Sequence, residues 1–101
     1  MGEDLLISEA LADELRLAVQ QLHDSPSRLL GGAPLSEPEL RPETVGGAVY
    51  VYELLAHPTA TKCYAWAAPR YGSSTVMHAV LHSDAIVSPE AAVRSVRRRK
   101  R

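Results

Sequence analysis

Side chains able to do chemistry gather between positions 57 and 84. The stretch HPTATKCYAW (57–66) holds a histidine, a lysine, the only cysteine, a tyrosine and the only tryptophan of the chain, and VMHAVLHSD (76–84) adds two histidines. Such residues serve metal binding, nucleophilic attack, acid–base catalysis and aromatic contacts. The elements that carry them set the distances between them, and so decide among these roles.

Three segments of this region have the composition of strands. AVYVYELL (48–55), TKCYAWAA (61–68) and TVMHAVLHS (75–83) are rich in β-branched and aromatic residues and follow one another at short spacing. The linker PRYGSS (69–74) contains the proline, glycine and serines typical of a hairpin loop. We therefore expect a three-stranded antiparallel meander.

Two helices are expected at the sides of this meander. Over residues 8–23 apolar side chains recur every three or four positions, at Leu11, Leu15, Ala18, Val19 and Leu22. Ser8 is placed to cap this helix. A second helix over 89–97 has Ser88 as its cap, Pro89 in its first position and Glu90 in its first turn.

Residues 24–47 between the first helix and the first strand hold four prolines and four glycines. This density predicts a connecting loop without a long regular element. Within it, Glu39 follows Ser36 at the capping-box spacing, which favours a single helical turn around residues 38–40.

These elements predict a single α+β domain spanning residues 1–101. Its length and its 46% hydrophobic content are typical of one globular domain. The element order is α-β-β-β-α, and we expect both helices to pack on one face of the sheet, leaving a basic tail at 97–101.

Strand alternation sorts the reactive residues onto two faces. Cys63, Ala65 and Ala67 share one side with Met77, Ala79 and Leu81, and the other side carries Lys62, Tyr64, Trp66, His78 and His82. A five-residue loop at 69–73 would set Tyr64 opposite His78, Lys62 opposite Val80, and Cys63 opposite Ala79. The helices are expected on the Cys63 side.

The other face then becomes a candidate binding surface made of Lys62, Tyr64, Trp66, His78 and His82. The alternative is that Tyr64 and Trp66 point into a core, because a chain with no phenylalanine and five aromatic residues has few other large side chains to fill one. Alternation groups these residues but does not decide which group faces water.

Strand geometry argues against a metal site and a thiol nucleophile. His78 and His82 would lie about 13 Å apart on a strand, whereas the same spacing on a helix would bring them within about 6 Å. Cys63 would lie across the sheet from both histidines and is expected to be a small buried side chain. We therefore predict no metal, no cofactor and no catalytic residue. An acid–base ribonuclease that uses Lys62, Tyr64, His78 and His82 is the enzymatic alternative.

Charge is distributed unevenly along the chain. Residues 94–101 hold six basic side chains, so the other 93 residues carry five basic against twelve acidic ones, a formal charge of −7. The basic run favours a nucleic-acid-binding alternative in which single strands stack on the aromatic sheet face. Phosphates would then contact the tail residues Arg94, Arg97, Arg98, Arg99, Lys100 and Arg101. The other interpretation is a solvated helix end whose charge complements the helix dipole and the acidic body.

Together these patterns predict a small non-catalytic binding or regulatory module that contacts proteins, with a homodimer through the sheet face or edge as one form. The start MGEDLLISEA has neither a basic leader nor a myristoylation signal, and no apolar run is long enough to cross a bilayer, so we expect no membrane partner. A single cysteine excludes an internal disulfide and suits the cytoplasm. The arginine, alanine and leucine bias indicates a bacterial source.

Overall fold

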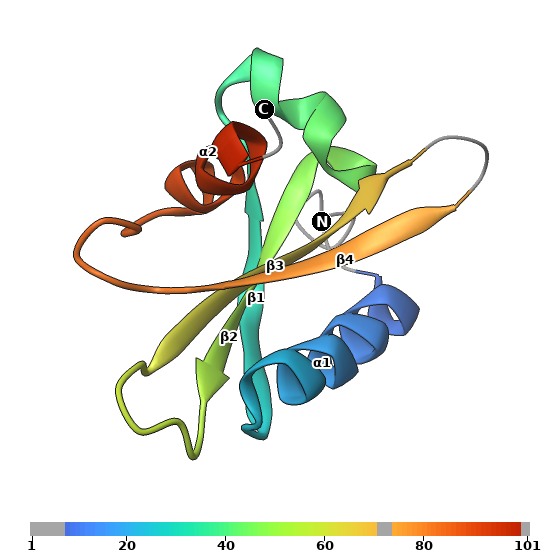
Figure 1. Cartoon of the computed structure of the whole chain (residues 1–101). Coiled ribbons are helices and arrows are strands. Elements are labelled where there is room, and N and C mark those ends of the chain that lie inside the picture. Colours follow the sequence, from blue (N-terminus) through green and yellow to red (C-terminus); the bar gives the residue numbers. More distant parts are fainter. Residues whose placement is uncertain (1–7, 71–73, 100–101) are drawn as a thin grey trace.

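The computed structural model describes residues 8–70 and 74–99, which form an α+β fold built around an antiparallel sheet (Figure 1). The four strands lie in the order β1-β2-β3-β4. In chain order the elements are α1 (Glu9–His23), β1 (Ser27–Pro34), the short 3-10 helices η2 (Pro38–Glu43) and η3 (Val45–Gly47), β2 (Ala48–Leu54), β3 (Lys62–Pro69), β4 (Thr75–Leu81) and α2 (Pro89–Arg99). The predicted fold class is confirmed, but the prediction of three strands is wrong.

The strand missing from the prediction is β1, which lies in the segment expected to be a loop. Its glycines and its terminal proline are poor strand formers inside a sheet, but β1 lies at the edge, where such residues are tolerated. The pairing of β1 with β2 shifts register between Leu29 and Gly31, so Leu30 is an extra residue in a β-bulge. Glycine and proline therefore mark a bulged edge strand here rather than a loop.

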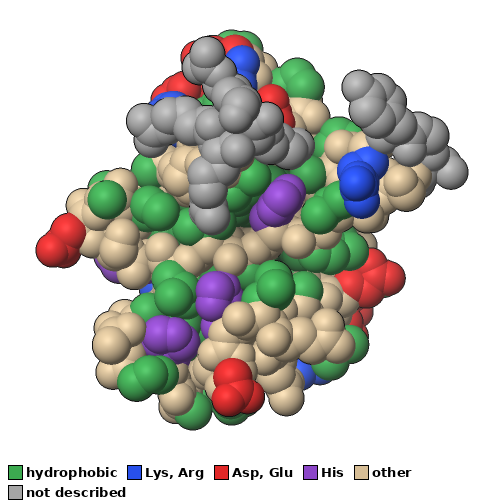
Figure 2. Space-filling view, in the orientation of Figure 1, with side chains coloured by type: hydrophobic (Ala, Val, Ile, Leu, Met, Phe, Trp, Pro, Cys, Tyr) green, Lys and Arg blue, Asp and Glu red, His purple; other side chains and the backbone are tan. Residues whose placement is uncertain are grey.

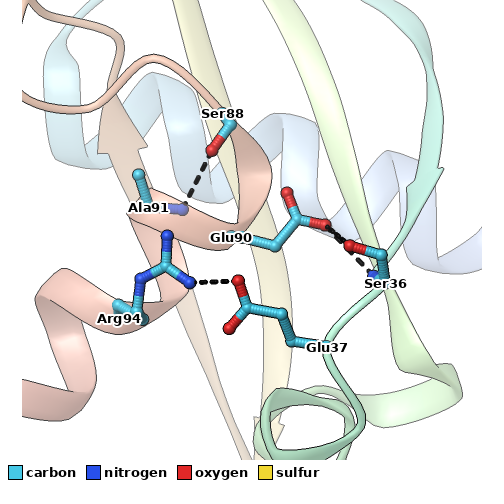
Figure 3. Close-up of polar contacts among 6 residues, drawn as sticks. All are labelled: Ser36, Glu37, Ser88, Glu90, Ala91 and Arg94. Carbon is cyan, nitrogen blue, oxygen red and sulfur yellow. Dashed lines mark hydrogen bonds and ion pairs between the residues drawn. The ribbon is translucent and has the colours of Figure 1, made fainter.

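Both main helices begin where the sequence predicts. The Ser8 side chain accepts a hydrogen bond from the Leu11 N–H at 3.3 Å, and Asp24 closes α1 in the left-handed conformation. At α2, the Ser88 hydroxyl accepts from the Ala91 N–H at 3.1 Å (Figure 3). Side-chain oxygens thus satisfy helix N–H groups that have no partner within the helix.

The β3–β4 pairing has the predicted parity but a different register. Trp66 lies opposite His78, Tyr64 opposite Val80 and Cys63 opposite Leu81, so the expected pairing of Tyr64 with His78 is wrong. The turn is closed by the Arg70 N–H donating to the Ser74 carbonyl at 3.1 Å, one residue later at each end than expected. This two-residue change in register leaves every side chain on its predicted face.

The two helices lie on opposite faces of the sheet, so the expectation of both on one face is wrong (Figure 1). On one side α1 packs against a core that contains Ala12, Leu15, Val19, Tyr50, Tyr52, Leu54, Ala60, Cys63 and Ala65. On the other side α2 and η2 contribute to a second core, which contains Leu35, Leu40, Val49, Tyr64, Trp66, Ala68, Val80, Ala92 and Val93. Both sheet faces carry large apolar side chains, and each therefore needs its own cover.

Segment 35–47 provides part of that second cover. Leu35 and Leu40 are buried in the α2-side core, and Gly46 and Gly47 take positive φ values of 82° and 72° as the chain turns into β2. The predicted helical turn is present as η2, but the predicted capping box is wrong, because Glu37 rather than Ser36 precedes η2 and no side chain caps it. The Ser36 hydroxyl donates instead to Glu90 of α2.

Candidate functional site

The candidate sheet surface is largely part of the α2-side core. Register places Lys62, Tyr64, Trp66, His78 and His82 on one face, as predicted, but Tyr64 and Trp66 are each only 2% exposed. The other three are partly buried. The alternative in which Tyr64 and Trp66 point into a core is therefore correct. The expectation that this face of the sheet is left uncovered is wrong.

The two histidines of this face each meet a different aromatic ring. The His78 ring lies 5.3 Å from the Trp66 ring between centroids. His82 Nδ1 and the Tyr64 hydroxyl form a hydrogen bond of 2.8 Å, and burial raises the pKa of Tyr64. These are two separate contacts at different positions along β3. They do not assemble the imidazole pair that an acid–base ribonuclease would need around one scissile bond.

Cys63 lies on the α1 face and is fully buried. Burial raises the pKa of its thiol to about 12. The thiolate is the nucleophilic form, so the environment of Cys63 suits a packing role better than covalent chemistry. Among residues 8–70 and 74–99, no three histidine, cysteine or acidic side chains come together in a way that could hold a metal ion.

The remaining two histidines meet where α1 ends and the β2–β3 connection begins. Their rings are T-shaped, with centroids 6.3 Å apart. His23 Nε2 lies 2.8 Å from the Ala79 carbonyl, which makes that nitrogen the donor. His57 Nδ1 accepts from the backbone N–H groups of Thr59 and Ala60, at 3.2 and 3.0 Å. His23 therefore links the end of α1 to β4, and His57 stabilises its own loop beside it.

Exposed leucines lie at this same end of the molecule. Leu22, which was expected on the buried stripe of α1, is 58% exposed, and Leu55 is 56% exposed. The Leu55 N–H donates to the Pro26 carbonyl at 2.9 Å, which fixes the end of β2 beside the segment that follows α1. We call Leu22, His23, Leu55 and His57 the leucine–histidine end.

Histidine and hydrophobic side chains lie next to each other on the lower part of the molecular surface (Figure 2). Sequence reasoning missed the leucine–histidine end because His23 and His57 are 34 positions apart in the chain. The helical period also predicts Leu22 as a core residue. In the structure, Leu15 and Val19 of the same apolar stripe belong to the α1-side core, and Leu22 does not.

The basic run is partly engaged by carboxylates of the segment before β2. Arg94 pairs with Glu37, and Arg97 Nε lies 3.7 Å from a Glu43 carboxylate oxygen. Glu90 accepts from both the N–H and the hydroxyl of Ser36, each at 3.1 Å (Figure 3). The side chains of Arg98 and Arg99, and residues Lys100 and Arg101, lie outside the described part. Two of the six basic residues proposed for phosphate contacts thus already hold α2 in place.

Each edge strand of the sheet has a feature that hinders pairing with a further strand. At β4, the Ala79 carbonyl already accepts a hydrogen bond from His23 Nε2. At β1, the bulge at Leu30 interrupts the ladder, although the Leu30 side chain is 54% exposed. Capping groups and bulges are common ways to block edge-to-edge pairing. The edges are therefore weaker candidates for a protein contact than the leucine–histidine end.

Comparison of the chain with protein-family models, curated proteins and solved structures gives no match. Within the described ranges, no helix is long and apolar enough to cross a membrane.

Proposed function

We propose that this chain is a small non-catalytic binding module that acts through protein–protein contacts, and that the leucine–histidine end is its contact surface. The observation that carries the proposal is the exposure of Leu22 and Leu55, each by more than half, at one end of the molecule. Burying exposed leucines is favourable by about 25 cal/mol per Å² of apolar surface, which gives this end a driving force for association.

The proposal moves the contact surface away from the sheet face. Tyr64 and Trp66 are already buried by α2 and η2, so a partner could reach them only by displacing α2. Leu22 and Leu55 need no such rearrangement. A preformed surface costs less to bind than one that must first be uncovered.

A second copy of the chain is the partner we propose. In a two-fold dimer the same patch meets itself, so a patch rich in like charges would repel its copy. Leucine side chains carry no charge and tolerate this arrangement. The bonds of His23 to the Ala79 carbonyl and of His57 to the loop amides also hold the patch in one shape before contact.

Sedimentation equilibrium over a wide concentration range tests the proposal. Wild type should show a monomer–dimer equilibrium that persists at about 0.5 M salt, because apolar contacts are not screened. Leu22→Ser and Leu55→Ser should each weaken it at least about tenfold, the effect of losing roughly 1.4 kcal/mol at an interface.

The matched control is Leu17→Ser, which removes a leucine of similar exposure (51%) from another part of α1. This variant should associate like wild type. A strict monomer at every concentration, or equal weakening by the control, would contradict the proposed surface.

The nucleic-acid alternative has less support. Arg94 and Arg97 are paired with Glu37 and Glu43, so phosphates would have to compete with these carboxylates for them. Binding that rests on phosphate contacts also weakens steeply with salt, whereas the apolar contact proposed here should not. Fluorescence anisotropy with single- and double-stranded probes at low salt separates the two cases.

A further inference from the structure

We infer a second binding site, for a small organic anion, in a recess at the tip of the β3–β4 hairpin. The recess has a volume of about 250 Å³ and is lined by Ala68, Pro69, Arg70, Val76 and His78. This site shares no residue with the leucine–histidine end, so its test is independent of the function proposed above.

The pairing of β3 with β4 explains why a hollow forms there. Ala68 lies opposite Val76, and one step inward Trp66 lies opposite His78, all on the face that carries α2. The short Ala68 side chain leaves space beside the larger Trp66–His78 pair. Three of the lining residues, Ala68, Pro69 and Val76, are apolar, so the hollow offers an ordered ligand an apolar floor.

A positive charge lies at the recess. Arg70 is exposed, and among the described residues its guanidinium pairs with no carboxylate. This differs from four other arginines, Arg16, Arg28, Arg94 and Arg97, each of which has a carboxylate partner. An arginine next to an apolar hollow, in a body that is otherwise acidic, provides charge complementarity for an anion.

His78 adds a second polar group to the same wall. The His78 ring lies 5.3 Å from the Trp66 ring between centroids, at an interplanar angle of 37°. Figure 2 shows a histidine and a basic side chain on the upper part of this surface with hydrophobic side chains close to both. The matching ligand carries a carboxylate or phosphate on a small apolar or aromatic group.

Trp66 gives this site a direct readout, because it is the only tryptophan of the chain and packs against His78. Benzoate and phenyl phosphate should produce a saturable change in tryptophan fluorescence, with Kd on the order of 1 mM for ligands of this size. Benzyl alcohol, which lacks the charge, and inorganic phosphate, which lacks the ring, should each bind at least about fivefold more weakly. Amide shifts in ¹H–¹⁵N spectra should centre on residues 66–70 and 76–78.

Two variants test the assignment of residues. Arg70→Gln should weaken benzoate binding at least about fivefold, while the matched control Arg28→Gln, an exposed arginine that pairs with Glu53, should leave it unchanged. Val76→Phe should fill the hollow and abolish binding, with circular dichroism confirming the fold. The inference would be overturned if neither benzoate nor phenyl phosphate gave a saturable fluorescence change, or if benzyl alcohol bound as tightly as benzoate. It would also be overturned if Arg28→Gln weakened benzoate binding as much as Arg70→Gln.

Discussion

Tyr52 is a buried residue whose polar atom has a hydrogen-bond partner inside the protein. Its side chain is fully buried in the α1-side core, yet its hydroxyl donates to the Ala12 carbonyl of α1 at 2.6 Å. Burial is the main cause that raises the pKa of Tyr52 well above its ordinary value. The hydrogen bond therefore holds a neutral phenol and links the helix to the sheet.

Tyr52→Phe should lower the free energy of unfolding by about 1 kcal/mol, the usual net value of a buried hydrogen bond. Urea unfolding at neutral pH measures this loss. Tyr64→Phe is the control: its hydroxyl bonds to the half-buried His82, where water can replace it, and a smaller loss is expected. Equal stability of Tyr52→Phe and wild type would contradict the structural role of the bond.

The Cys63 thiol should be inert in the folded protein. It is inaccessible, and burial raises its pKa to about 12, so very little thiolate exists near neutral pH. A chromogenic disulfide reagent at about pH 8 should react with it only as fast as the chain opens, and at once in denaturant. Fast, stoichiometric reaction of the native protein would revive a nucleophilic role.

At the scale of elements, α2 makes polar contacts with the rest of the fold as well as apolar ones. Ala92 and Val93 are its fully buried residues, and both are small. Glu90 contacts Ser36 and Arg94 pairs with Glu37, both in the segment before β2 (Figure 3). Arg97 pairs with Glu43 of the same segment. Its docking should therefore depend on the ionisation of Glu90.

The pKa of Glu90 is lowered, chiefly by the hydrogen bond from the Ser36 N–H. A carboxyl with a lowered folded-state pKa adds stability above its unfolded-state pKa and loses it as pH falls through the folded-state value. Glu90→Gln should therefore melt below wild type at pH 7, and the gap should close in acid. Glu14→Gln, an exposed glutamate of α1, should show no such gap. A pH-independent difference would rule out the charge of Glu90 as the cause.

Truncation after Val96 should leave both cores intact and cost at most about 1 kcal/mol. It removes the Arg97–Glu43 pair, whose side chains are 48% and 31% exposed, and exposed pairs contribute little. Thermal melts monitored by circular dichroism test this. A larger loss would mean that the last turn of α2 supports the fold.

The elements differ in how well the sequence predicts them, for physical reasons. The α1 helix and strands β2 to β4 follow from local signals: the period of Leu15 and Val19, the Ser8 cap, and β-branched or aromatic runs. The β1 strand is stabilised by its pairing with β2, a non-local contact that overrides the strand-breaking effect of Gly31 and Gly32.

The candidate contact surface was not predictable in the same way. Alternation assigned Tyr64 and Trp66 to the correct face, but no local pattern shows which helix covers that face. The contact of His23 with His57 likewise depends on tertiary structure, because it joins the end of α1 to a loop after β2.

At the scale of the whole molecule, one sheet serves two cores. Alternate residues of β3 belong to each: Cys63 and Ala65 to the α1 side, Tyr64 and Trp66 to the α2 side. A substitution in β3 that changes backbone position should therefore disturb both cores. Both surfaces proposed above, the leucine–histidine end and the recess beside the β3–β4 turn, lie toward the ends of this sheet.

The residues that complete the two cores also differ in their position along the chain. Every residue of the α1-side core lies between positions 11 and 81, so that core needs no residue of α2. The α2-side core needs Ala92 and Val93, which are made later. Until α2 is made, Trp66 lacks the cover that Ala92 and Val93 provide. Apolar surface that is exposed during folding is prone to aggregation, and docking of α2 removes such surface from this face of the sheet.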